Sequence, residues 1–156
     1  MVNIYGGKIT TYRTLAEAAV DKLKKVFPNM KPAWTKHAAL PGGDFNSREA
    51  LYSQLLADYP WLPKTILKRF IRQYGTLSYQ ILESCHTLED LGEDFGQGLY
   101  QKELCYLSQQ EWAKSADDVI WRRTKLGLKL TAEQKEQLNR YFASKTITHI
   151  TEKCCA

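Results

Sequence analysis

The chain has 156 residues, of which 44% are hydrophobic, 12% aromatic and 25% charged. This composition excludes bulk disorder, and the length suits one domain, or one domain plus part of another. The net charge of +5 would suit a nucleic-acid partner, but residues 37–111 hold six basic against ten acidic side chains, so we expect no nucleic-acid binding.

The first predicted element is a short strand at residues 2–5, which two glycines end. Apolar residues then recur at helical spacing; they are Tyr12, Leu15, Ala16, Ala19, Val20, Leu23 and Phe27. Prolines and the turn sequence PGGD predict a linker at residues 29–44. We therefore divide the chain into a strand–helix unit at residues 1–28, the linker, and a domain at residues 45–156.

Helices are expected throughout residues 45–156, so the predicted fold class is mainly α, a multi-helix domain preceded by the strand–helix unit. Asn46 begins a capping-box pattern, and its helix runs to about Tyr59. Pro63 suits the first position of the next helix, and Gly75 ends that helix.

Four further helices are predicted in the rest of the chain. The first covers about residues 77–84, and the second carries the apolar residues Leu104, Leu107 and Trp112. The third is capped by Ser115 and Asp118 and is expected to end at Gly127. The last is capped by Thr131 and Gln134, and its apolar residues are Leu138, Tyr141, Phe142 and Ile150. We expect Trp61, Trp112 and Trp121 to pack in the core of this domain.

The stretch GGKIT, residues 6–10, invites comparison with phosphate-binding loops. It has neither the spacing of a P-loop nor that of the dinucleotide fingerprint. What remains is a strand-to-helix junction with flexible glycines, unpaired N–H groups at a helix start, and the cation of Lys8. Such a junction suits an anion or the electron-rich edge of a ring. The alternative is a plain tight turn with a solvated lysine.

Other candidate sites have weaker patterns. The basic run WRRTK at residues 121–125 could contact phosphate, but basic residues in a last helical turn more often complement the helix dipole. Acidic residues at 90, 93 and 94 lack the spacing of an EF-hand and are interpreted as loop or capping residues. The three histidines lack metal-ligand spacing, so no metal site is expected.

The cysteines and the hydropathy pattern bear on location. The four cysteines, Cys85, Cys105, Cys154 and Cys155, have no CxxC spacing and are expected to be reduced thiols, the last two in a frayed tail. No apolar run approaches the roughly 18 residues of a membrane span. The N-terminal residues do not have the pattern of a secretory signal. We therefore expect a cytoplasmic protein.

Three stretches of the sequence carry a family resemblance. VNIYGGKITTYRTLAEAAVDKL, residues 2–23, resembles the closing strand and helix of the flavin domain in FAD-dependent glycerol-3-phosphate dehydrogenases. DLGEDFG, residues 90–96, and ADDVIWRRTKLGL, residues 116–128, are similar to stretches of the helical C-terminal domain of that family, in the same order. The resemblance reaches to about Ser144 and is to the aerobic, quinone-linked bacterial type. It implies a C-terminal fragment of such an enzyme.

The resemblance also implies roles for the junction. The residues that would face the pyrimidine end of the flavin are Gly6, Gly7, Lys8, Ile9, Thr10 and Thr11, and Lys8 would also approach the substrate. The implied reaction oxidises the C2 hydroxyl of sn-glycerol 3-phosphate to dihydroxyacetone phosphate and passes the electrons to a quinone. No catalytic residue is assigned to this fragment, because the base would lie in the flavin and substrate domain of the parent chain.

The implied partners are the flavin domain of the parent chain, glycerol 3-phosphate and quinone, with a homo-oligomer as a further option. The parent would lie at the inner face of the cytoplasmic membrane, and the fragment alone would be inactive and free of FAD. The alternative is an independent helical module that binds nucleic acid or a protein. Residues 1–27 argue against that alternative, because a lone strand needs pairing partners.

Overall fold

The computed structural model describes residues 1–147, with side chains up to Ser144. The chain divides into two compact units, Met1–Pro41 and a second unit that begins at Gly42, and each is considered by itself. The predicted mainly helical class is confirmed: the described part contains helices and a single isolated bridge between Asp94 and Tyr100, but no strand.

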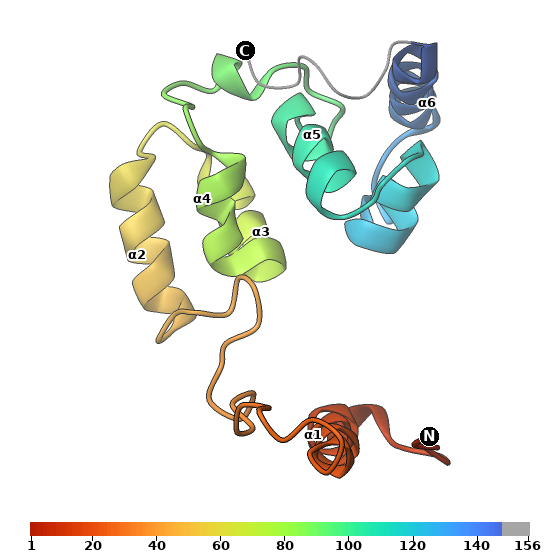
Figure 1. The fold of residues 1–156 in the computed structure, drawn as a ribbon. Helices are drawn as coiled ribbons and strands as arrows, with labels where there is room; N and C mark the ends of the chain where they lie inside the picture. The colour runs from red at the N-terminus through yellow and green to blue at the C-terminus, as the bar shows by residue number, and fades with distance from the viewer. Residues whose placement is uncertain (148–156) are drawn as a thin grey trace. The chain divides into compact units, whose positions relative to one another are not determined.

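The first unit consists of a short 3₁₀ turn, η1 (Ile9–Thr11), which leads into helix α1 (Tyr12–Leu23) (Figure 1). The short strand predicted at residues 2–5 does not form. A strand is stabilised by hydrogen bonds to a neighbour, and no segment of the described chain pairs with this one. The helix predicted from the apolar stripe is present.

No residue of the first unit is buried, although all 41 of its residues are described. The segment after α1 is tied to the helix by polar contacts rather than by a core. The hydroxyl of Thr35 donates to the Glu17 carboxylate at 2.5 Å, and Glu17 also pairs with Arg13 at 2.8 Å. The apolar stripe of α1 therefore has no core of its own to enter.

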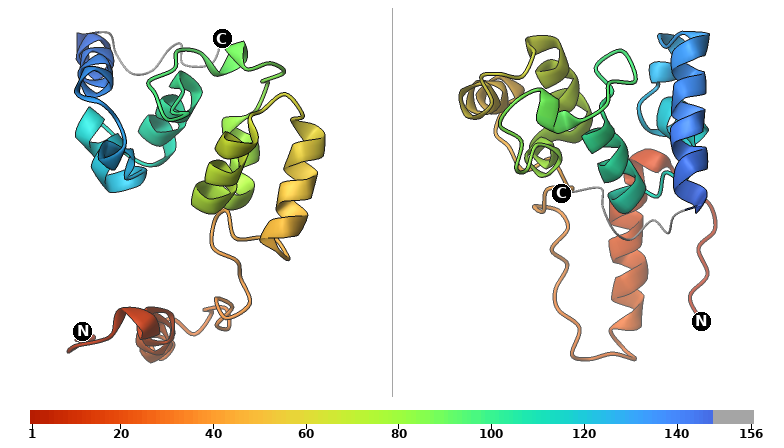
Figure 2. Two further views of the ribbon diagram at one scale, coloured as in Figure 1. Left: turned by 180° about the vertical axis from the view of Figure 1, so that it is seen from behind. Right: turned by 90° about the horizontal axis from the view of Figure 1, so that it is seen from above.

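The second unit begins with a helical hairpin of α2 (Arg48–Asp58) and α3 (Lys64–Tyr74), which lie side by side in both views (Figures 1 and 2). A 3₁₀ turn, η2 (Gly75–Leu77), joins α3 to the one-turn helix α4 (Ser78–Ile81). Gly75 ends α3 as predicted. Its φ is +56°, and a Cβ there would lie 1.8 Å from the carbonyl oxygen of Gly42, so only glycine fits.

The remaining elements are η3 (Glu89–Leu91), α5 (Gln101–Gln110), the π-helical turn η4 (Asp118–Arg123), η5 (Leu126–Leu128) and α6 (Ala132–Ile147). The reciprocal cap predicted for α6 is confirmed: the Thr131 hydroxyl accepts from the Gln134 amide, and the Gln134 side chain accepts from the Thr131 amide. Ser115 and Asp118 form the same reciprocal arrangement at the start of η4.

Several helix boundaries differ from prediction: α4 ends at Ile81 rather than near residue 84, and α5 ends at Gln110, before Trp112. Ser47, not Asn46, caps α2, because its hydroxyl accepts from the Ala50 amide at 3.1 Å. The helix predicted to end at Gly127 ends earlier, where Lys125 takes the left-handed conformation with φ of +59°. Ile150, Cys154 and Cys155 lie outside the described residues.

The core of the second unit is built from leucines and aromatic rings of α2, α3, α5 and the loops between them, including Leu55, Phe70, Phe95 and Leu104, all fully buried. Trp61 packs against this core in part, as predicted. The prediction for Trp112 is wrong: it follows the end of α5 and is 80% exposed. Trp121, predicted to be buried, is 40% exposed.

Within the described residues, no helix is both long enough and apolar enough to cross a membrane.

Candidate functional site

The glycine pair forms the turn predicted between an extended segment and a helix. Gly6 and Gly7 have φ of +76° and +146°, and Lys8 is extended before η1 begins. A Cβ on Gly7 would lie 2.9 Å from Leu15 of α1, so the turn packs against the helix that it starts. Both positions therefore need glycine, which leaves the backbone open to close approach.

The Lys8 carbonyl closes the turn. It accepts hydrogen bonds from the Thr11 amide at 3.0 Å and from the Thr11 hydroxyl at 3.1 Å. The Thr11 amide is thus occupied, whereas the amides that precede it have no carbonyl four residues earlier in the helix and remain available to a ligand. All six residues from Gly6 to Thr11 are exposed. Lys8 forms no ion pair in the part of the chain that the structure describes.

The junction would suit one edge of a flavin ring and not the whole cofactor. Its exposed turn amides can donate to an electron-rich ring edge, and Lys8 adds a positive charge. The substituent-free backbone at Gly6, where a Cβ would meet nothing within 4 Å, leaves room for a flat group. The pyrophosphate and adenosine of FAD would need contacts from other segments.

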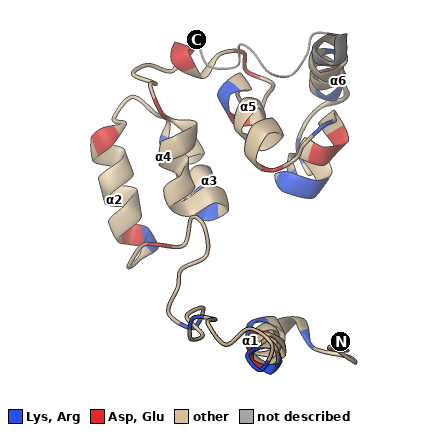
Figure 3. Cartoon of the chain, in the orientation of Figure 1, with Lys and Arg blue, Asp and Glu red and all other residues tan. Residues whose placement is uncertain are grey.

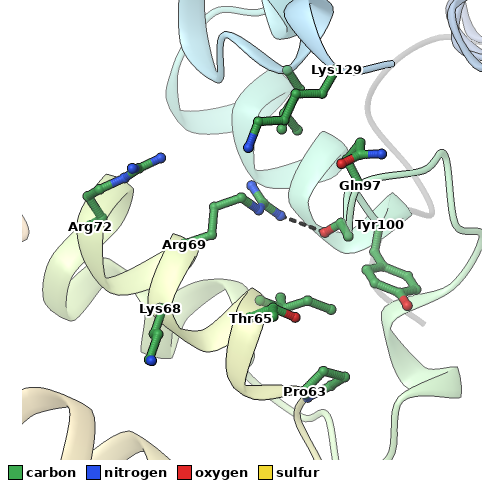
Figure 4. A pocket seen from close by; sticks show the side chains of 11 residues that line it. Pro63, Thr65, Lys68, Arg69, Arg72, Gln97, Tyr100 and Lys129 are labelled. Atoms are coloured by element: carbon green, nitrogen blue, oxygen red, sulfur yellow. Dashed lines mark hydrogen bonds between the residues drawn. The ribbon is translucent and has the colours of Figure 1, made fainter. Parts of the chain in front are cut away.

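The second unit holds a basic pocket that sequence reasoning missed. This cavity of about 720 Å³ is lined by Pro63, Thr65, Ile66, Lys68, Arg69, Arg72, Gln97, Gly98, Tyr100, Leu126 and Lys129 (Figure 4). Its central residue is Arg69, which makes two hydrogen bonds to the carboxylate of Glu103, at 2.7 and 2.6 Å. Glu103 is completely buried and also accepts from the hydroxyl of Tyr74 at 2.5 Å.

The electrostatics of this cluster follow from its burial. Burial lowers the pKa of Arg69, but the hydrogen bonds and charge of Glu103 outweigh that effect, so the pKa is raised. Burial and the nearby Glu103 charge raise the pKa of Tyr74 well above its usual value. The guanidinium is therefore charged at every relevant pH. No signal in the sequence singles it out, because Arg69 lies beside the apolar stripe of α3, which is formed by Ile66, Leu67, Phe70, Ile71 and Tyr74.

The other candidates have structural roles. The start of η4 is acidic and its end basic, which complements a helix dipole (Figure 3). Arg122 pairs with Asp118 at 2.8 Å, and Lys125 donates to the Trp121 carbonyl. Asp90 accepts from two loop amides, those of His86 and Thr87, which lower its pKa. No cluster of three or more metal-binding side chains occurs among the described residues.

Comparison with known proteins identifies the family. Residues 33–144 match the family described as the C-terminal domain of alpha-glycerophosphate oxidase. The chain is 46% identical over 145 residues to glycerol-3-phosphate dehydrogenase of Pseudomonas aeruginosa, covering 92% of this chain and 28% of that protein. It is 41% identical over 147 residues to aerobic glycerol-3-phosphate dehydrogenase of Escherichia coli, covering 94% of this chain and 29% of that protein.

A third relative has a different name. The chain is 40% identical over 144 residues to D-erythritol 1-phosphate dehydrogenase of Brucella abortus, covering 91% of this chain and 29% of that protein. The chain thus spans less than a third of the length of these relatives. Because the family match extends over most of the chain, the chain belongs to the family of the C-terminal domain of alpha-glycerophosphate oxidase, the domain that it shares with glycerol-3-phosphate dehydrogenases.

Proposed function

We propose that this chain is the C-terminal part of an FAD-dependent dehydrogenase that oxidises sn-glycerol 3-phosphate at its C2 hydroxyl to dihydroxyacetone phosphate. Two relatives that are named glycerol-3-phosphate dehydrogenases support this substrate. The electron acceptor is a quinone, by resemblance to the aerobic bacterial type. The parent lies in the cytoplasm, at the inner face of the cytoplasmic membrane.

The observation that carries this proposal is the exposed first unit. Many of its large apolar side chains are exposed, among them Ile4, Ile9, Tyr12, Val20 and Phe27, each at least 47% exposed. Apolar surface of this kind marks a contact with another body. The flavin domain of the parent chain is the partner that would cover it, and its sheet would also give residues 2–5 a strand to pair with.

The residues of the junction would then act on the flavin and the substrate. A bound FAD would supply a hydride acceptor whose reduced ring carries negative charge near one edge. The amides of Lys8, Ile9 and Thr10 and the dipole of α1 would stabilise that charge, while the Thr11 amide closes the turn. The ammonium group of Lys8 would neutralise part of the substrate phosphate. The base that removes the hydroxyl proton belongs to the rest of the parent.

D-Erythritol 1-phosphate is a second candidate for the substrate of the parent enzyme. The relative named D-erythritol 1-phosphate dehydrogenase is as similar to this chain as the Escherichia coli relative is, within one percentage point. Both compounds carry a phosphate that Lys8 could bind, so the junction does not discriminate between them. Assay of the parent with each compound at matched concentrations would assign the substrate.

The test of the proposal is Lys8→Ala in the full-length parent. A charge-assisted contact to flavin or phosphate is worth roughly 1.5–3 kcal/mol. The kcat/KM for glycerol 3-phosphate should therefore fall about tenfold to a hundredfold, while bound FAD and stability hardly change. Lys25→Ala, another exposed lysine of the first unit, is the matched control. Equal kinetics of the two variants would remove Lys8 from the site.

A further inference from the structure

The basic pocket of the second unit has an unbalanced charge. Four of its lining residues are cationic, and none of the described lining residues is acidic. Glu103, behind the wall of the pocket, compensates Arg69 only. Arg72 and Lys129 are exposed and have no ion pair in the described part of the chain. Two positive charges therefore remain at one opening.

The geometry concentrates these charges. In Figure 4 the head groups of Arg69, Arg72 and Lys129 lie on the same side, and Lys129 points toward Arg69. Lys68 points away from them, and its ammonium lies 5.9 Å from the ring centroid of Tyr52. The pocket therefore has three cationic groups that a ligand could meet.

The floor of the pocket is held rigidly. The turn that contains Gly98, with φ of +72°, packs against α3, and a Cβ on Gly98 would lie 2.9 Å from Ile66. This close approach lets the Gly98 carbonyl accept from Arg69 at 2.5 Å. Together with Glu103, the carbonyl fixes the guanidinium in one orientation.

The Arg69 side chain still has an unused donor. Its Nε–H is buried and has no hydrogen-bond partner in the described structure. A buried donor without an acceptor is unusual in proteins and indicates a missing partner. Thr65, Gln97 and Tyr100 add neutral polar side chains to the lining of the pocket. The pocket thus offers cations and donors to one ligand, with no competing acid.

We propose that this pocket binds the phosphate group of a phosphate monoester, with Arg72 and Lys129 as its direct cationic contacts and Arg69 as the fixed donor between them. A phosphate monoester carries nearly two negative charges at neutral pH, which matches the two cations that have no acidic partner. The volume of about 720 Å³ leaves room for the organic part of the ester. This proposal does not depend on the dehydrogenase reaction.

The proposal is tested by titrating the isotope-labelled 156-residue chain with inorganic phosphate. Binding is monitored by the chemical shifts of the backbone amides in NMR spectra. We expect saturable shifts around Gln97, Gly98 and Lys129 with a Kd near or below about 1 mM. Arg72→Gln combined with Lys129→Gln should raise that Kd at least about tenfold. Both residues are exposed, so the variant should fold, which circular dichroism checks.

The matched control removes the same charge elsewhere. Lys114→Gln combined with Arg140→Gln lowers the net charge equally, and both residues are exposed and lie outside the pocket. Its Kd should stay within about twofold of the unchanged chain. Equal weakening by both double variants would mean general charge attraction and would overturn the site.

Two sources of the phosphate are distinguished by a second arm. Vesicles of phosphatidylcholine with phosphatidic acid present a phosphate monoester on a lipid surface, and pure phosphatidylcholine vesicles are their control. Binding of inorganic phosphate alone would assign a soluble ester. Vesicle binding that the pocket variant abolishes would assign a lipid headgroup. Failure of both probes to bind, or binding that ignores the pocket variant, would overturn the proposal.

Discussion

Glu103 should contribute more to the stability of the second unit than any surface charge. Its carboxylate is fully buried and accepts three short hydrogen bonds, two from Arg69 and one from Tyr74. The Arg69 side chain is itself only 12% exposed. Glu103→Gln removes the negative charge and places the NH₂ group of glutamine beside the Arg69 guanidinium, which can only donate hydrogen bonds. A buried guanidinium would then lack its counter-charge.

The size of the effect follows from that geometry. Breaking a buried ion pair by removing one partner costs roughly 3–5 kcal/mol, because the remaining charge stays desolvated. A domain of this size is stable by roughly 5–15 kcal/mol, so Glu103→Gln should remove a large fraction of the free energy of unfolding. Tyr74→Phe removes one hydrogen bond to the same carboxylate and should cost about 1.5–3 kcal/mol.

Urea unfolding at neutral pH, followed by tryptophan fluorescence and circular dichroism, measures both values. Glu136→Gln is the control, because Glu136 is exposed, and it should change the unfolding free energy by no more than about 0.5 kcal/mol. The expected order of destabilisation is Glu103→Gln, then Tyr74→Phe, then the control. A Glu103→Gln variant as stable as the control would refute this reasoning, because it would mean that water reaches the Arg69 guanidinium and replaces the lost carboxylate.

Three further outcomes are expected. Gly75→Ala should destabilise the second unit by at least about 2 kcal/mol in urea unfolding, because alanine adds strain at positive φ and meets the Gly42 carbonyl; a neutral effect would exclude this contact. The amide of Lys114 and the hydroxyl of Ser115 hold the pKa of Asp118 below its usual 3.8. The ionised carboxylate therefore contributes fully to folding stability above about pH 4, and this contribution is lost as the pH falls further. Asp118→Asn should therefore unfold with a weaker acid dependence than the unchanged chain, and parallel pH profiles would contradict this. Removal of residues 1–28 should reduce self-association in sedimentation experiments, since the exposed apolar stripe is lost; identical monomers would rule out pairing through this unit.

The sequence by itself determined the features that depend on neighbours along the chain. Helical class, the cap of Thr131 with Gln134 and the stop at Gly75 all rest on contacts or backbone conformations within a few residues, so their signals are local. The glycine turn at residues 6 and 7 was predictable for the same reason.

Tertiary structure decided what depends on distant segments. The predicted strand at residues 2–5 does not form, because the hydrogen bonds of a strand come from another segment. The exposure of Trp112 depends on how the chain leaves α5, which no periodicity encodes. Arg69 and Glu103 are 34 positions apart in the sequence. Both charges are desolvated, and the basic pocket forms, only when α3 packs against α5 and against the turn before α5 that contains Gly98.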